Sequence, residues 1–376
     1  MLSFALVANP ETRRVELFQQ ALARFNLPPA EVIPYEELLA GRCFLHEWDS
    51  LDRHFRFDAP ERSFNVDRAF IAAGADQPGN HWKVSAIEAY NLPADKGRIL
   101  HPRQWYLGWK TRLQEWSSVQ GTILNHPDDI VRMFDKTVCQ RILASHNIPI
   151  PRSLSSINSY EELCEEMERQ NCDRVFIKLA HGSSASGVVA YERRAGAERA
   201  ITSVERVVEQ GELRFYNSRK IRQYRDSREI AGIINFLARE RVQVERWMPK
   251  ARIEGREFDA RVVVIGGKAR QVVLRLGNSP MTNLHLGNDR RDISALPRSL
   301  APETWAEMMR TCERAGACFP KSFYCGIDLL IAPNWKDHYI LEMNAFGDLL
   351  QGITWNGQDT YTTEIEMLME RHQCST

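Results

Sequence analysis

The sequence lacks the features that mark several classes of protein. Its 376 residues contain no apolar run approaching the ~20 residues that a membrane-spanning helix needs. Lysine plus arginine and aspartate plus glutamate both number 49, so the formal charge is zero. This balance argues against a general nucleic-acid or membrane-surface binder and leaves local basic patches open. Internal repeats and low-complexity tracts are absent too. The first ten residues carry no basic leader and no long apolar segment, so we expect no signal peptide.

Cysteine is present but not in a metal-binding or disulfide pattern. The eight cysteines are scattered, without any Cys-x-x-Cys pair, and several lie within apolar patterns. This favours reduced core thiols in a cytoplasmic protein over a zinc site. The 43% apolar and 26% charged residues are typical of an ordinary soluble globular protein, and the length allows two or three domains.

The first third of the chain begins as an α/β protein. Residues 3–9 form an apolar run, residues 13–25 have the apolar spacing of a helix, and residues 30–34 fit a second short strand. This βαβ start predicts a small domain built on a parallel sheet. Residues 43–120 are rich in tryptophan and charge, and their elements cannot be ordered. Within them, residues 53–62 fit a surface loop better than part of a substrate pocket.

Beyond residue 120 the pattern predicts a longer series of elements. We expect helices over 130–143, 159–170, 198–210, 230–239, 302–315 and 360–371, and strands over 175–179, 188–191 and 242–245. The first of these helices would be capped by Asp128 or Asp129, and the second by Asn158 or Ser159. Residues 258–265 and 269–276 flank two glycines and predict a two-residue hairpin. The segment 147–151 is expected to link two domains.

The most informative stretch runs from Phe323 to Gly347. Two apolar runs flank Pro333–Asp337, a pattern typical of a hairpin. With the turn centred in that connector, Asp328 lies opposite Glu342, and because side chains alternate along a strand, Glu342 and Asn344 share a face. Two neighbouring carboxylates repel unless a cation lies between them, and a set of oxygen ligands suits Mg²⁺. The alternative is a solvated polar face.

Two lysines could meet phosphate groups. Lys178 lies in an apolar strand, where burial is costly unless a negative group meets it. The loop after it, residues 181–187, is nearly all Gly, Ser and Ala. Small residues let backbone N–H groups approach phosphate oxygens, although a plain Gly/Ser hairpin loop would look the same. Lys136, at the start of the interdomain helix, is a second candidate cation, and a solvated lysine is its simpler interpretation.

Further charged residues follow within apolar surroundings. A predicted strand ends at Glu245, and the connector Arg246-Trp-Met could present backbone groups to an adenine edge. Glu257 and Asp259 come next, before Arg261 in a valine-rich strand. A buried arginine implies an anionic partner, either a carboxylate or a phosphate.

Taken in order, these positions resemble the ATP-grasp superfamily, and within it the RimK-type and glutathione-synthetase-like amino-acid ligases. The resemblance covers roughly residues 120–350. It is most specific in Gly326-Ile-Asp-Leu-Leu with Leu341-Glu-Met-Asn, and in Met281-Thr-Asn-Leu-His-Leu-Gly. It implies an ATP-grasp fold of the α/β (α+β) class. The implied domains are an N-terminal pre-ATP-grasp-like α/β domain at 1–124, a central subdomain with the phosphate loop at 125–248, and a C-terminal subdomain with the metal hairpin at 249–376.

The resemblance also implies a role for each position. ATP would be bound by the lysines, the small-residue loop and the adenine connector with the acidic residues after it: Lys136, Lys178, Ser183, Ser184, Ser186, Gly187, Glu245, Trp247, Met248, Glu257 and Asp259. The implied catalytic set consists of Lys178, Arg261, Asn283 and His285. One or two Mg²⁺ would be held by Asp328, Glu342 and Asn344.

The implied activity is ATP-dependent ligation. A carboxylate would take the γ-phosphoryl group of ATP, an amine would attack the acyl phosphate, and an amide or peptide bond would form with release of ADP and phosphate. The implied partners are small-molecule or peptide carboxylates and amines, with no nucleic acid and no membrane, and a homo-oligomer is left open. A kinase-like phosphotransferase and a nucleotide-binding regulatory protein without catalysis are the alternatives.

The sequence departs from the family pattern near the acceptor site. Met281 and Leu286 stand where RimK-type enzymes usually or often carry arginine, and Ala345-Phe-Gly replaces the usual Ser/Thr-Ser-Pro-Gly. Fewer cations put a strongly anionic co-substrate, such as glutamate, in doubt. An additional basic and aromatic segment, residues 214–225, could reach phosphate, bind a peptide or form a solvated strand.

Overall fold

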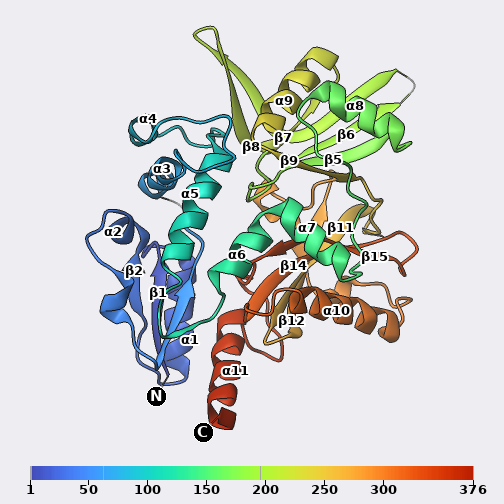
Figure 1. Ribbon diagram of the computed structural model, residues 1–376. Helices are drawn as coiled ribbons and strands as arrows, with labels where there is room; N and C mark the ends of the chain where they lie inside the picture. Colours follow the sequence, from blue (N-terminus) through green and yellow to red (C-terminus); the bar gives the residue numbers. More distant parts are fainter. Residues whose placement is uncertain (1, 62, 195, 376) are drawn as a thin grey trace.

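The chain folds around three β-sheets, each formed by a different part of the sequence (Figure 1). The computed structural model describes residues 2–61, 63–194 and 196–375. The sheets have the strand orders β2-β1-β3-β4, β8-β7-β6-β5-β9 and β13-β12-β11-β14-β15, and β10 pairs with β11. In the first sheet all pairs are parallel, and in the other two all are antiparallel.

The N-terminal sheet confirms the predicted βαβ start. Its strands are β1 (Ser3–Ala8), β2 (Glu31–Pro34), β3 (Arg53–Phe57) and β4 (Thr122–Ile123). Helix α1 (Arg13–Arg24) joins the first two strands and is capped by Thr12, whose hydroxyl accepts a hydrogen bond from the Val15 N–H. Helix α2 (Tyr35–Leu39) follows β2. The region 43–120, which the sequence left unordered, holds the short 3₁₀ turn η1 (Leu45–Trp48), the strand β3, α3 (Phe64–Ala73), α4 (Ala86–Tyr90) and α5 (Pro102–Glu115). The surface loop expected from residue 53 onward is therefore wrong for Arg53–Phe57, where Phe55, Arg56 and Phe57 are buried.

The central sheet is covered by two amphipathic helices. Its strands are β5 (Arg174–Leu179), β6 (Val189–Arg194), β7 (Ala197–Glu209), β8 (Glu212–Tyr224) and β9 (Val242–Arg246). Helices α8 (Tyr160–Arg169) and α9 (Ser227–Arg239) pack their apolar faces on the strands. Ser159 caps α8 by accepting a hydrogen bond from the Glu162 N–H at 3.2 Å, as one of the two predicted caps.

The prediction of a helix over residues 198–210 is wrong. These residues form β7, which pairs with β8 in a long ribbon. Ile201, Val204 and Val207 have helical spacing, but they are β-branched side chains that pack well on a pleated surface. Because these residues pair with β6 on one side and β8 on the other, they form a strand and not a helix. Residues 214–225, left open above, lie almost entirely in β8.

The C-terminal sheet contains both predicted hairpins. Its strands are β10 (Arg252–Ile253), β11 (Arg256–Ile265), β12 (Lys268–Gly277), β13 (Asp289–Arg291), β14 (Tyr324–Ile331) and β15 (His338–Asn344). Gly266 and Gly267 have φ of +59° and +82°, the left-handed conformation that a two-residue turn requires. The 3₁₀ turns η2 (Leu284–Leu286) and η3 (Ile293–Ala295) and the helix α10 (Pro302–Ala317) lie between β12 and β14, and α10 packs on the sheet. Helix α11 (Thr360–Ser375) packs on α1.

The helix predicted over 130–143 is in fact two helices, α6 (Pro127–Phe134) and α7 (Lys136–Ser145). Asp135 separates them, and its carboxylate caps α7 by accepting hydrogen bonds from the Thr137 and Val138 N–H groups. The predicted cap of the first helix is wrong, because His126 accepts from the Asp128 N–H. Both helices pack on β15, and α6 also packs on α5 (Figure 1).

The remaining predictions concern thiols and membrane spans. The seven cysteines whose side chains the structure describes are free, and Cys139, Cys312 and Cys325 are buried, as expected of reduced core thiols. Cys374 lies outside the described side chains. Across the described ranges, we find no helix whose length and apolar character would let it cross a bilayer.

Candidate active site

A cavity lies between the central and C-terminal sheets and gathers most of the residues predicted for function. Those lining it are Lys136, Lys178, Ser183, Ser184, Ser186, Glu245, Met248, Asp259, Arg261, Asn283, Asp328, Glu342 and Asn344. They come from the start of α7, strand β5 and the loop after it, strand β9 and the connector after it, and strands β11, β14 and β15, with Asn283 just before η2. The structure therefore brings the lysines, the small-residue loop and the acidic hairpin together around one space.

The hairpin β14–β15 has the predicted register. Asp328 pairs directly with Glu342, and a bulge follows at Leu329. Arg261 Nε bonds Asp328 Oδ1 at 2.5 Å, and Arg275 Nη2 lies 3.0 Å from Oδ2. Burial alone would raise the pKa of Asp328, but the two guanidinium groups outweigh it and hold the pKa well below its usual range. Asp328 is therefore ionised at neutral pH.

Each of the two lysines is held by a carboxylate. Lys136 Nζ lies 3.0 Å from Glu342 Oε1 and donates to the Gly182 carbonyl at 2.6 Å. Lys178 Nζ lies 2.5 Å from Glu245 Oε1. Burial alone would lower the pKa of Lys178. The nearby carboxylates of Glu245 and Glu342 outweigh this effect and raise the pKa above its ordinary value, so the side chain stays charged. This satisfies the requirement that a buried lysine meets a negative group.

A second buried cluster surrounds Asp259. Arg275 Nε bonds Asp259 Oδ1 at 2.7 Å, Lys250 Nζ lies 3.4 Å from Oδ2, and the Thr282 hydroxyl donates to Oδ2. Lys250 also donates to the Thr282 hydroxyl at 2.7 Å. Sequence reasoning missed Arg275 and Lys250, although both line the cavity. The sequence offers the same signal for Arg275 as for Arg261, namely a basic residue inside an apolar run, here of valine and leucine.

The small-residue loop bends sharply over the cavity. Ser184 and Ala185 have φ of +52° and +59°, a conformation uncommon outside glycine, and the Ser186 N–H donates to the Ser183 carbonyl at 2.8 Å. The Ser203 hydroxyl of β7 donates to the Ala185 carbonyl at 2.7 Å. The loop is therefore tied to the ribbon β7–β8 at its tip.

Four predicted residues are outside the lining: Gly187, Trp247, Glu257 and His285. Gly187 has a φ of +64°, and a Cβ there would come within 2.5 Å of Leu179. The Trp247 N–H donates to the Arg174 carbonyl at 3.1 Å, so it is not free to meet an adenine. Glu257 lies 3.7 Å from Arg252. His285 lies exposed in η2, two residues from Asn283.

The donor set at the hairpin fits Mg²⁺. Asp328, Glu342 and Asn344 offer only oxygen ligands, the kind that Mg²⁺ prefers, and leave room for water and phosphate oxygens. The Asn344 amide nitrogen is buried and has no hydrogen-bond partner in the part of the chain that the structure describes, so the amide can turn its oxygen to a metal. Within the same ranges, no group of three or more His, Cys, Asp or Glu side chains is placed to hold a metal ion. Any metal here would rely on two carboxylates and this amide.

Comparison with known proteins shows the fold. No protein-family model and no curated protein matches the sequence. Several solved structures match this chain almost end to end, including the following three. D-cycloserine synthetase DcsG is 12% identical, with 97% of this chain and 99% of that chain covered and a TM-score of 0.58. The ATP-grasp ligase PsnB, complexed with a phosphomimetic variant of its minimal precursor, Mg and ADP, is 14% identical, with 98% of both chains covered and a TM-score of 0.55.

The third is the macrocyclase MdnC bound with precursor peptide MdnA from Microcystis aeruginosa MRC. It is 11% identical, with 98% of this chain and 100% of that chain covered and a TM-score of 0.54. Identities this low show the fold alone. The chain has the ATP-grasp fold, a mixed α/β arrangement of a parallel N-terminal sheet and two antiparallel sheets, and the predicted fold class is confirmed.

Proposed function

We propose that the protein is an ATP-dependent, Mg²⁺-requiring carboxylate–amine ligase of the RimK-type or glutathione-synthetase-like kind. The observation that supports this most directly is the cavity in which Lys136, Lys178 and the small-residue loop face Asp328 and Glu342. These are the groups that a metal–triphosphate complex needs, gathered around one space.

The charge of the cavity suits a nucleotide triphosphate. Six basic and four acidic side chains line it, so a positive excess faces the bound ligand. Asp328 and Glu342 are now paired with Arg261, Arg275 and Lys136. Phosphate oxygens would take over these cations and leave the carboxylates to a metal ion. When bound there, Mg²⁺ would neutralise phosphate charge and orient the γ-phosphoryl group.

Part of the cavity lining suits a purine. Phe176, Met248, Leu330 and Leu341 provide apolar walls, and Glu245 adds a carboxylate that can accept a hydrogen bond from an exocyclic amine. The proposed hydrogen bonds to the adenine edge come from Met248 and not from the Trp247 N–H, which Arg174 already occupies.

Phosphoryl transfer would take place near Arg261 and Arg275. Two guanidinium groups beside the ionised Asp328 can stabilise charge on the transferred phosphoryl group and on the acyl phosphate that forms from the substrate carboxylate. Asn283 and His285 would lie where the amine attacks to give the amide. The loop tied down by Ser203 would exclude water, which otherwise hydrolyses an acyl phosphate.

Substrate size stays open within this proposal. The printed descriptions of PsnB and MdnC name peptide precursors, whereas DcsG is named for the synthesis of D-cycloserine. The fold therefore serves peptide and small-molecule chemistry, and both kinds of carboxylate and amine belong in the first test.

The experiment is incubation with ATP, Mg²⁺ and pooled carboxylates and amines. We expect ADP, formed only when both a carboxylate and an amine are present. AMP as the sole nucleotide product would contradict the acyl-phosphate route. Release of ADP without any amine would favour a phosphotransferase, and ATP binding without ADP under every pool would favour a regulatory protein.

Variants of the hairpin β14–β15 test the metal ligands. Asp328→Asn and Glu342→Gln are expected to remove turnover while the protein stays folded. Asp337→Asn, in the exposed turn of the same hairpin, is the matched control and should keep wild-type turnover. Wild-type turnover in the first two variants would refute the metal assignment.

A further inference from the structure

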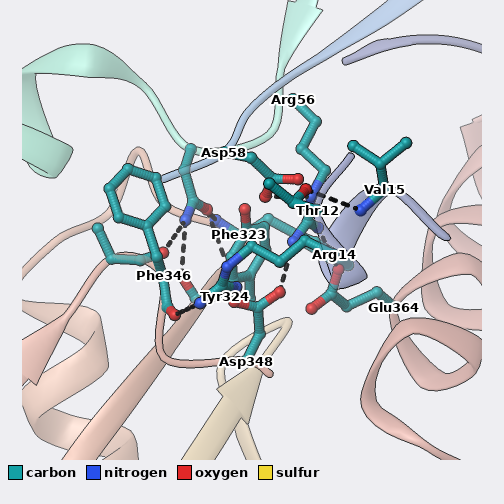
Figure 2. A network of polar contacts seen from close by, with 12 residues as sticks. Thr12, Arg14, Val15, Arg56, Asp58, Phe323, Tyr324, Phe346, Asp348 and Glu364 are labelled. Carbon is teal, nitrogen blue, oxygen red and sulfur yellow. Dashed lines mark hydrogen bonds and ion pairs between the residues drawn. The ribbon is translucent and has the colours of Figure 1, made fainter. Parts of the chain in front are cut away.

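The loop that leaves strand β15 is held by side chains from distant parts of the chain (Figure 2). Ala345 follows Asn344 directly, and its carbonyl accepts a hydrogen bond from Asn125 Nδ2 at 3.1 Å. Arg14 Nη2, from the first turn of α1, donates to the Phe346 carbonyl at 2.6 Å. Two consecutive carbonyls beyond the proposed metal ligand are thus fixed by groups outside the hairpin.

Arg14 holds the same loop at a second point. Its Nη1 donates to Asp348 Oδ1 at 2.7 Å, so one planar guanidinium donates hydrogen bonds to both a carbonyl and a carboxylate of the loop. Asp348 is fully buried, and Arg56 bonds its other oxygen. Arg56 in turn bonds Glu364 Oε2 at 2.5 Å. Because buried charges are stable only when paired, this network leaves Asp348 little freedom to move.

The backbone transmits the position of this loop to Asn344. The Gly347 N–H donates to the Asn344 carbonyl at 3.1 Å and closes a tight turn. Gly326, which pairs with Asn344 in the sheet, touches Gly347 so closely that a Cβ on Gly326 would lie 2.5 Å from the Gly347 Cα. The loop cannot shift without shifting the end of β15.

The Asn344 side chain has little to hold it in place by itself. Its amide nitrogen has no hydrogen-bond partner in the described ranges, so its direction follows from the backbone that carries it. A metal ligand of this kind depends on the groups that fix its strand.

We propose that Arg14 of the N-terminal domain is a positioning residue for the metal-binding end of β15. It does not touch the metal or the nucleotide. Through its contacts with the loop after β15, Arg14 fixes the position of Asn344 and thereby determines the affinity of the site for Mg²⁺. The proposal rests on the proposed function, since it assumes that the hairpin binds Mg²⁺ with a nucleotide.

The test measures binding of ADP to the whole protein by calorimetry, first in EDTA and then over a series of Mg²⁺ concentrations. For the wild type we expect Mg²⁺ to tighten ADP binding. For Arg14→Gln we expect the Mg²⁺ concentration at half-maximal tightening to rise roughly 10–100-fold, the range seen when groups that orient metal ligands are removed. Binding of ADP in EDTA should stay close to wild type. A general loosening of the fold would instead weaken ADP binding in both conditions.

Two further variants complete the design. Arg13→Gln is the matched control, because Arg13 is the neighbouring residue, is exposed and forms an ion pair with Glu16 on the same helix. It should leave the Mg²⁺ requirement unchanged. Arg14→Lys keeps the charge but not the planar fork, and should give an intermediate shift. If Arg14→Gln does not fold, Arg14→Lys is the variant whose Mg²⁺ requirement is compared with that of the wild type. Folded Arg14 variants with the wild-type Mg²⁺ requirement would overturn the inference alone, whereas a wild type without Mg²⁺-dependent tightening would overturn the proposed function and the inference with it.

Discussion

Lys136 and Glu342 form an ion pair of 3.0 Å across the candidate active site. Lys136 begins α7 and Glu342 lies on β15, so the pair joins two sides of the cavity. The same ammonium group donates to the Gly182 carbonyl in the small-residue loop. One side chain therefore connects the loop that would cover the phosphates with the strand that would hold the metal.

The first prediction concerns the charge of Lys136. Lys136→Met is expected to weaken ATP binding in EDTA by roughly 10–100-fold, because a hydrogen bond to a charged group contributes about 1.5–3 kcal/mol. Calorimetric titration with ATP measures this. Lys321→Met is the control, since Lys321 is an exposed lysine that pairs with Asp128 outside the cavity. Equal ATP affinity in the wild type and Lys136→Met would show that Lys136 does not contact the phosphates.

The second prediction concerns the tie between the loop and the ribbon β7–β8. Ser203→Ala removes the hydrogen bond to the Ala185 carbonyl, which contributes about 0.5–1.5 kcal/mol. If the loop closes over ATP, KM for ATP should rise by roughly two- to tenfold. Steady-state kinetics at varied ATP measure the change. Ser117→Ala removes a similar bond to the Gln114 carbonyl in the N-terminal domain and should leave KM unaltered. If KM for ATP were the same in Ser203→Ala and Ser117→Ala, the hydrogen bond of Ser203 to the loop would have no part in ATP binding.

The register of the hairpin β14–β15 could be predicted from sequence because local chemistry fixes it. The breakers in Pro333–Asp337 place the turn, and the two-residue period of a strand then brings Asp328 opposite Glu342. The βαβ start and the Gly266-Gly267 hairpin were predictable for the same reason. In each, residues close in sequence determine the geometry.

The partner of Asp259 was not predictable in this way. Continuing the register of the Gly266-Gly267 turn, in which Ile265 pairs with Lys268, would put Asp259 opposite Leu274. A bulge after Val262 shifts the register by one, so Arg275 pairs with Asp259. Such a one-residue shift turns Arg275 to the cavity face. No local pattern marks the bulge.

Contacts between distant segments were also beyond local reasoning. The helical spacing of Ile201 and Val204 is overridden by two neighbouring strands, and the contact of Arg14 with Asp348 joins opposite ends of the chain. The sequence located most of the residues around the cavity, whereas their individual roles stay predictions. The positions of these residues are determined by tertiary packing.

The third prediction concerns the contact of Gly326 with Gly347. Gly326→Ala would place a Cβ 2.5 Å from the Gly347 Cα, and the backbone cannot yield as a flexible side chain can. We expect a loss of about 1–3 kcal/mol in the free energy of unfolding, the usual cost of overpacking. Gly232→Ala in α9 is the control, since a Cβ there meets no atom within 4 Å, and it should raise stability by about 0.5–1 kcal/mol. Denaturant unfolding measures both. A Gly326→Ala protein as stable as the wild type would mean that the loop at Gly347 can move away from β14 at no cost.

The fourth prediction concerns Glu364, which is fully buried beside Arg56. Burial raises its pKa from 4.5 to about 8, although Arg56 opposes the rise. The folded state therefore binds a proton that the unfolded state has lost between about pH 4.5 and 8, so the contribution of Glu364 to stability is complete below this window and falls as the pH rises through it. Glu364→Gln mimics the protonated acid and cannot ionise. We expect the free energy of unfolding of the wild type to fall relative to that of Glu364→Gln between pH 5 and pH 8.5, measured by denaturant unfolding. Parallel curves for the two proteins would show that Glu364 does not take up a proton on folding.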